Sequence, residues 1–222
     1  FKKKKIRLSN IAILTRASFQ FKDIEDRFLK ENIKYKVVGG LRFYERAEIK
    51  DALSYFRLLI NKSDNLSLER IINIPKRGLG KAFLKSIYEI SNNREISLFD
   101  ALKVCIESEL INLSKIEKLN SFINIVDRHT SMLKNKSHFE VAGSLLDDVG
   151  YTEMLQNEKT PESEGRLENL KKLITDIKNR RSIDEFLEEV SLLIDNSSQD
   201  NKSERVSLMT LHSAKGLEFD YV

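Results

Sequence analysis

The stretch Tyr35-Lys36-Val37-Val38-Gly39-Gly40 marks the point at which the chain changes character. Its apolar residues predict a short strand, and the glycine pair suits a sharp change of chain direction because glycine restricts the backbone least. Upstream, residues 11–14 predict another buried strand, and residues 21–32 carry apolar side chains at helical spacing. Strand, helix and strand in this order are typical of a parallel α/β sheet.

The chain downstream of Gly40 has a helical pattern for about 155 residues, in which apolar side chains recur three and four positions apart. We interpret these apolar stripes as core. Three serines each precede a carboxylate by three positions, which is typical of a helix start. They are Ser97, Ser137 and Ser182, and they predict helices that begin at Leu98, His138 and Ile183.

The last part of the chain returns to strand patterns. Asp195 to Glu204 is a polar tract without apolar periodicity, which predicts a surface loop or linker. Residues 206–211 then predict a strand, and residues 217–222 predict the start of another. The two ends therefore share α/β character and the middle is helical, so we expect an all-helical domain inserted into an α/β domain.

Composition excludes several classes of protein. Of 222 residues, 41% are hydrophobic, which is enough for a core, and two prolines and eight glycines are too few for a fold of many short strands. The single cysteine, Cys105, cannot form an internal disulfide, and three scattered histidines give no zinc-site spacing. No apolar run approaches the roughly 20 residues of a membrane span. We expect a cytoplasmic protein without a membrane partner and, because the chain starts with Phe1, a piece of a longer one.

Charge permits a polyanionic partner without requiring one. Lys and Arg number 38 against 34 Asp and Glu, which gives a net charge of +4. The basic residues gather in four clusters, and each cluster taken alone is also compatible with a solvated surface. The clusters are Lys2 to Arg7, Arg42 to Arg46, Lys76-Arg77 and Arg180-Arg181.

The densest group of polar residues follows the predicted strand near the end of the chain. It reads Thr210-Leu211-His212-Ser213-Ala214-Lys215-Gly216-Leu217-Glu218-Phe219. Ligands of open α/β sheets bind at the carboxyl ends of strands, and a hydroxyl, an imidazole, an ammonium and a glycine there suit a phosphate-rich ligand. Spacing alone is also compatible with a capped turn that carries a solvated Lys215.

A second candidate site is the turn Lys76-Arg77-Gly78-Leu79-Gly80, directly before a predicted helix. Two glycines let the backbone approach a phosphate closely, and the amide groups and dipole of the helix start favour an anion. Leu79 would anchor the turn in the core, while Lys76 and Arg77 add cations. The same pattern also suits a plain loop between two helices.

As strings, these segments resemble a known family. The segment 210–219 resembles motif V of the superfamily 1 DNA helicases of the UvrD, PcrA and Rep type. Ile11 to Arg16 resembles the strand and arginine that open this half of the second motor domain, and Val38 to Asp51 is similar to the entry into its helical insertion. Ile74 to Gly80 is similar to the duplex-binding turn of that insertion. The resemblance spans residues 10–222.

The resemblance implies a mainly α fold, in which an all-helical insertion lies within an incomplete RecA-like α/β domain with a parallel sheet. Residues 1–40 and 204–222 would belong to motor domain 2A, which is truncated at motif V. Residues 41–203 would form the helical insertion 2B. A swivel about Gly39-Gly40 and the tract 195–204 would regulate unwinding.

The resemblance also implies roles for particular residues. Arg16, Thr210 and His212 would contact single-stranded DNA, while Gly216 and Glu218 would face the nucleotide. The five residues of the turn would contact duplex DNA: Lys76, Arg77, Gly78, Leu79 and Gly80. Thr15 stands where relatives often have tyrosine, which puts a stacking contribution there in doubt. We predict no catalytic residue and no metal ligand in this chain.

The implied activity of the full-length protein is that of an ATP-dependent 3′ to 5′ DNA helicase, with ATP and Mg²⁺ and with repair proteins as further partners. This chain has no Gly-x-x-x-x-Gly-Lys-Ser/Thr loop, so alone we expect it to be a monomer that neither binds nor hydrolyses ATP. Two alternatives stay open. One is a subunit of a helicase-nuclease complex, and the other is a non-enzymatic helical domain that binds proteins.

Overall fold

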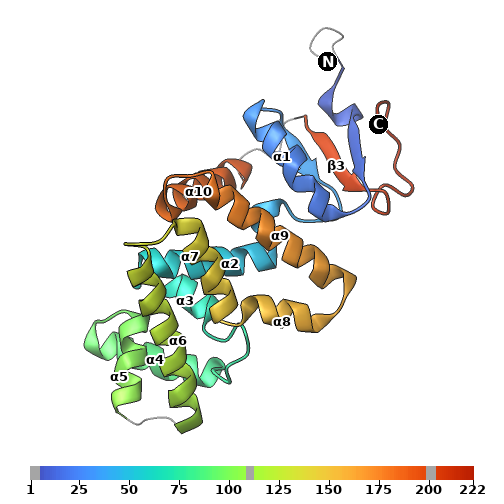
Figure 1. Cartoon of the computed structure of the whole chain (residues 1–222). Helices are drawn as coiled ribbons and strands as arrows, with labels where there is room; N and C mark the ends of the chain where they lie inside the picture. Colours follow the sequence, from blue (N-terminus) through green and yellow to red (C-terminus); the bar gives the residue numbers. More distant parts are fainter. Residues whose placement is uncertain (1–5, 109–112, 199–203) are drawn as a thin grey trace. The chain divides into compact units, whose positions relative to one another are not determined.

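The computed structural model describes residues 6–108, 113–198 and 204–222, and these form two compact units. The first unit comprises residues 1–49 and 190–222, and the second comprises residues 50–189. The expectation of a mainly helical chain with a small parallel sheet is confirmed (Figure 1).

The first unit is built on a parallel sheet of three strands. The strands are β1 (Ala12–Thr15), β2 (Tyr35–Val37) and β3 (Val206–Thr210), and their order in the sheet is β1-β3-β2. The last strand in sequence is therefore the central one. The register pairs Thr15 with Thr210 and Val37 with Leu208, so that β1 and β3 end at the same level.

Helix α1 (Phe21–Lys30) covers one face of this sheet (Figure 1). Its Phe28 packs with Ile11, Tyr35 and Val206 in a buried cluster, and the rings of Phe28 and Tyr35 lie 5.4 Å apart. Burial of such side chains is worth roughly 1.5–3 kcal/mol each and holds helix and sheet together. Short 3₁₀ helices at Leu8–Asn10, Ser18–Gln20 and Phe43–Glu45 connect these elements.

In the second unit, the regular elements among the described residues are all helices. It begins within α2 and ends within α10, and its helices are α2 (Ala47–Ile60), α3 (Asn65–Ile71), α4 (Lys81–Arg94), α5 (Leu98–Glu107), α6 (Leu113–Met132), α7 (His138–Asp148), α8 (Tyr151–Glu158), α9 (Pro161–Lys178) and α10 (Ile183–Ser198). The predicted apolar stripes of α2, α6 and α9 are largely buried, with Phe56, Phe122 and Leu173 at most 1% exposed. Ile60, which was also expected in the core, lies at the end of α2 and is 43% exposed. The predicted helix starts at Leu98, His138 and Ile183 are confirmed.

Two expectations near the end of the chain need correction. The polar tract that begins at Asp195 was expected to be a loop, yet α10 continues to Ser198. The tract contains neither glycine nor proline, and polar side chains alone do not interrupt backbone hydrogen bonding in a helix. Residues 199–203 lie outside the described residues. Beyond Leu217 the described chain makes one isolated bridge, between Ile11 and Tyr221, instead of a strand, because a strand needs successive bridges.

Candidate nucleic-acid interface

The carboxyl ends of β1 and β3 bring three predicted site residues to one edge of the sheet. Arg16 follows directly after Thr15, which pairs with Thr210, and the amide of Leu211 donates to the carbonyl oxygen of Thr15 at 2.9 Å. Arg16 and His212 are exposed, and Thr210 is half-buried. The backbone amide of Arg16 is held by the Gln20 side chain at 3.1 Å, which leaves its guanidinium facing solvent. A cation, a hydroxyl and an imidazole are thus available at this edge.

Hydrogen bonds to Thr210 fold the following loop into a compact turn. The Thr210 hydroxyl lies 3.0 Å from the Ser213 hydroxyl and accepts the Ser213 amide at 3.2 Å, while the Thr210 carbonyl accepts the Ala214 amide at 3.0 Å. Thr210 therefore shapes the turn as well as lining it. Gly216 follows with φ of 82° and open space beside its Cα, and Glu218 is exposed. A backbone without a side chain and a carboxylate are accessible there, as a nucleotide contact would require.

After the end of β2, Gly39 makes a contact that sequence reasoning did not predict. Gly39 has φ of 72°, and a Cβ at this position would lie 2.7 Å from the Ser213 hydroxyl oxygen. The glycine pair therefore allows the chain that leaves β2 to pack against the turn after β3. The pattern Gly-Gly shows that a small residue is needed, but the partner lies 174 positions away and gives no local signal.

The second candidate site lies in the helical unit, before α4. Gly78 has φ of 76°, a conformation that favours glycine, and Leu79 is 0% exposed, which confirms the predicted anchor. Added Cβ atoms at Gly78 and Gly80 would meet nothing within 4 Å. Lys76 is exposed beside them. The amides of Gly78 and Gly80 have no partner among residues 6–108, 113–198 and 204–222, so the turn presents free donors at a helix start.

Arg77 differs from the other residues of the turn because its side chain points into the protein. Its guanidinium donates to backbone carbonyls and a tyrosine hydroxyl and lies 4.9 Å from the ring centre of Phe122. Sequence reasoning also missed Asn73, whose side-chain oxygen accepts the amides of Arg77 and Leu79. The sequence signal was an asparagine shortly before the turn, a residue type that often bonds nearby backbone amides.

Comparison with known proteins identifies the family of this chain. The model of the UvrD-like helicase C-terminal domain matches residues 1–222. The chain belongs to this family. The expected resemblance to UvrD and PcrA helicases is thereby confirmed.

Several curated relatives of this UvrD-like chain have helicase names. The "Probable DNA helicase II homolog" of Rickettsia felis is 44% identical over 214 residues, which cover 96% of this chain and 33% of the relative. "DNA helicase II" of Rickettsia typhi is 43% identical over 214 residues, which cover 96% of this chain and 32% of the relative. "ATP-dependent DNA helicase PcrA" of Staphylococcus aureus is 39% identical over 224 residues, which cover 96% of this chain and 30% of the relative. The UvrD-like chain thus spans about a third of the length of these relatives.

In the remaining basic clusters of the UvrD-like chain, three arginine side chains form hydrogen bonds or an ion pair within the chain. Arg46 is 8% exposed and donates to the carbonyl of Ser18 at 2.9 Å, and Arg42 donates to the carbonyl of Tyr35 at 3.2 Å. Arg180 pairs with Glu189 at 2.6 Å. In the first cluster, residues 2–5 lie outside the described residues. These contacts favour structural roles for Arg42, Arg46 and Arg180.

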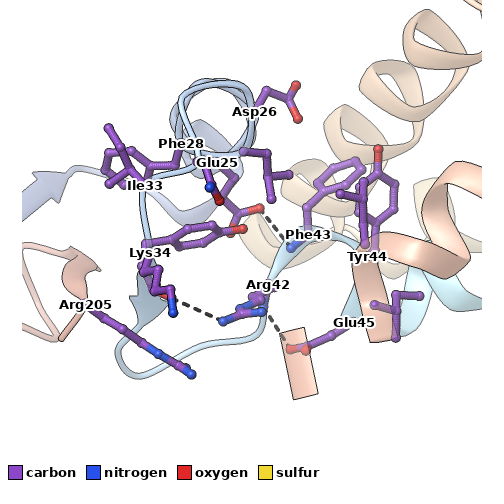
Figure 2. Close-up of a pocket in the computed structure, with 15 residues that line it drawn as sticks. Glu25, Asp26, Phe28, Ile33, Lys34, Arg42, Phe43, Tyr44, Glu45 and Arg205 are labelled. Atoms are coloured by element: carbon purple, nitrogen blue, oxygen red, sulfur yellow. Dashed lines mark hydrogen bonds between the residues drawn. The ribbon is translucent and has the colours of Figure 1, made fainter. Parts of the chain in front are cut away.

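A cavity of about 340 Å³ lies within the first unit and is lined in part by Arg42. Figure 2 shows the residues that line it. The cavity is lined by α1, the segments 32–35 and 42–45, Leu193 and Ile194 of α10, and Arg205. Glu25, which is 2% exposed, accepts the amide of Phe43 at 3.1 Å (Figure 2). Burial raises the pKa of Glu25 above its ordinary value of 4.5, and the Phe43 amide, Arg46 and Lys22 offset only part of this effect.

No group of three or more His, Cys, Asp and Glu residues in the described ranges is placed to hold a metal ion. Among the helices that the structure describes, none is long and apolar enough to span a membrane.

Proposed function

We propose that the full-length protein is an ATP-dependent DNA helicase that moves 3′ to 5′ along single-stranded DNA and unwinds duplex. In this proposal residues 1–40 and 204–222 belong to motor domain 2A, and residues 41–203 form the insertion 2B. The relatives named as helicases support the activity. The observation that carries the proposal is the meeting of Arg16 with Thr210 and His212 at one edge of a parallel sheet.

These three side chains suit a single strand of DNA. A guanidinium binds a phosphate with two parallel hydrogen bonds, and an exposed imidazole and a hydroxyl donate to phosphate or sugar oxygens without selecting a base. A motor that moves along DNA of any sequence needs contacts of this kind. Thr210 also holds the turn through Ser213, so its hydroxyl links the shape of the loop to the DNA contact.

ATP is the proposed substrate that drives movement, and Mg²⁺ accompanies its phosphates. Gly216 and Glu218 are the residues of this chain that we assign to the nucleotide, because an open backbone and an exposed carboxylate follow the same turn. The group that binds ATP would therefore share a loop with the group that binds DNA. We assign Mg²⁺ no ligand among the described residues.

Binding of single-stranded DNA to the full-length protein across a salt series tests the motor site. Arg16→Gln removes a phosphate contact, so we expect weaker binding. In this titration with a single strand, the magnitude of the log–log salt slope should fall by about 0.7 for each lost phosphate contact, whereas the corresponding value for duplex is about 0.9. Arg27→Gln is the matched control, because Arg27 is exposed and pairs with Glu31 near the far end of α1. Equal slopes for wild type and Arg16→Gln would contradict the role of Arg16.

Within the turn at residues 76–80, we assign the duplex contact to Lys76 and to the amides of Gly78 and Gly80. Gly80→Ala adds one methyl group that meets nothing within 4 Å among the described residues, so it obstructs a ligand that approaches the backbone. We expect it to weaken binding to a tailed duplex while binding to a single strand is kept. Gly165→Ala is the control, because it adds the same methyl group in open space on α9. Unchanged duplex affinity for Gly80→Ala would contradict the duplex contact.

A further inference from the structure

The turn at Gly78 to Gly80 is supported by the side chain of Asn73. Its Oδ1 atom accepts the amide of Arg77 at 2.8 Å and the amide of Leu79 at 3.1 Å. The two amides that alternate with the glycine amides are thereby bound inside the protein. Gly78 and Gly80 keep amides without a partner in the described part of the chain. One side-chain oxygen thus decides which donors of the turn stay free.

Arg77 supports the same turn from its other side. Its Nη1 atom lies 3.1 Å from the carbonyl oxygens of Ile71 and Ile72, 3.2 Å from that of Ile74 and 3.3 Å from that of Pro75. These carbonyls belong to the end of α3 and the segment that follows it, and carbonyls at a helix end lack partners within the helix. Because one guanidinium nitrogen lies within hydrogen-bond distance of all four carbonyl oxygens, it holds the backbone that leads into the turn in one conformation.

The other half of the guanidinium connects the turn to distant parts of the helical unit. Nη2 donates to the Tyr55 hydroxyl at 3.1 Å, and it also donates to the carbonyl of Val149 at 3.2 Å, 72 positions along the chain. The group lies 4.9 Å from the ring centre of Phe122, where a cation is attracted to the ring face. Both terminal nitrogens of Arg77 are therefore engaged within the protein.

We propose that Asn73 and Arg77 are positioning residues for duplex binding, which hold the Gly78–Gly80 amides in a phosphate-binding arrangement without touching DNA themselves. This inference rests on the proposed duplex contact of the turn. It assigns Arg77 a different role from that of Lys76, whose side chain is exposed. A phosphate contact by Arg77 would require the guanidinium to give up its carbonyl partners, and buried carbonyls without partners are costly.

Exchange of Arg77 for lysine separates a positioning role from direct phosphate contact. Lysine keeps the positive charge but cannot reach several carbonyls at once with a planar group. We expect Arg77→Lys and Arg77→Gln in the full-length protein to weaken duplex binding to a similar extent. The expected loss is at least about tenfold, the scale of losing one hydrogen bond to a charged group. Single-strand affinity stays at the wild-type value, since its proposed site lies in the other unit.

Hydrogen exchange without DNA gives a second readout that general loss of stability would not produce. We expect Arg77→Lys and Asn73→Ala to raise amide exchange in peptides that cover residues 73–82, while peptides from α9 keep wild-type exchange. Asn73→Ala is the milder change, because it removes one acceptor and leaves the guanidinium in place. It therefore tests the inference even if Arg77 variants fail to fold.

The possible outcomes separate this inference from the proposed function. If Arg77→Lys binds duplex like wild type, while Arg77→Gln lowers the salt slope by about 0.9, Arg77 contacts phosphate directly and the positioning role is wrong. If Gly80→Ala weakens duplex binding but Asn73→Ala and Arg77→Lys do not, only the positioning role fails. If Gly80→Ala also has no effect, the proposed duplex contact fails and the inference fails with it.

Discussion

At the scale of single residues, Glu25 is a buried carboxylate whose pKa lies above its ordinary value. One of its oxygens accepts the Phe43 amide, and the other is buried without a hydrogen-bond partner. Arg46 and Lys22 lie near enough to lower its pKa, yet burial outweighs them and the net direction is upward. The ionised form of Glu25 is therefore less favourable in the folded protein than in the unfolded chain.

This residue should make stability depend on pH. Because the folded state holds the Glu25 proton more tightly than the unfolded state, its contribution is fully present below pH 4.5 and is lost as pH rises through the folded pKa. We expect Glu25→Gln, which keeps an acceptor for the Phe43 amide, to gain stability relative to wild type near neutral pH. This gain should vanish as the pH falls toward 4.5.

Urea unfolding measured by circular dichroism from about pH 4 to about pH 8 checks this expectation. Glu31→Gln is a suitable control, because Glu31 is half-exposed and pairs with Arg27. An equal pH profile for wild type and Glu25→Gln would mean that Glu25 ionises in the folded state as easily as in the unfolded chain.

At the scale of elements, helices α5 and α7 are both preceded by a serine three positions before a carboxylate, but only one of the two serines caps its helix through its side chain. The Ser97 hydroxyl accepts the Asp100 amide at 3.1 Å and caps α5. Ser137 precedes α7 at the same spacing from Glu140, but its side chain makes no cap bond, and its hydroxyl oxygen is buried without a partner. Both helices begin where the pattern predicts.

Alanine substitutions at the two serines should therefore differ in their effect. We expect Ser97→Ala to lower the free energy of unfolding by about 1 kcal/mol, because a cap bond is lost. Ser137→Ala should be neutral or stabilising, because it removes a buried hydroxyl that has no partner. Both sites lie in the second unit, so urea unfolding of that unit compares them directly. Equal losses at both serines would indicate that Ser137 caps α7 in solution.

Sequence reasoning succeeded at this scale where the signals are local. Strand, helix and strand around α1, the helix starts and the buried Leu79 all follow from spacing within a few residues. It missed contacts between distant segments, such as Gly39 against Ser213 and Arg77 with the Val149 carbonyl. The charge of Arg77 suggested a solvent-facing cation, because a sequence does not reveal how many carbonyls converge on one point. The DNA and nucleotide roles of the site residues remain predictions.

At the scale of the whole molecule, the two units differ in how the chain builds them. The helical unit is one continuous stretch, residues 50–189, whereas the sheet unit needs both ends of the chain. Strand β3 lies between β1 and β2, so those two strands make no ladder with each other.

Removal of residues 199–222 should therefore affect the two units unequally. Without β3, strands β1 and β2 lose their common partner, so we expect amides of residues 6–38 to exchange rapidly. Amides in α6 and α9 should keep their protection, because their buried contacts lie within residues 50–189. Hydrogen exchange followed by mass spectrometry makes the comparison. Protection of β1 in the shortened chain would show that the first segment forms a stable structure by itself.

The central position of β3 in the sheet also determines when the sheet can form during synthesis on the ribosome. Strand β2 leaves the ribosome about 170 residues before β3, which at roughly 5–20 residues per second is a delay of about 9–34 s. During that interval the helical segment can fold. Strands β1 and β2 meanwhile have unpaired edges, which can form hydrogen bonds with other chains. The sheet that carries Arg16 is thus among the last parts of this chain to become complete, and a nascent chain stalled before Val206 can have a folded helical unit but lacks the strand that pairs β1 with β2.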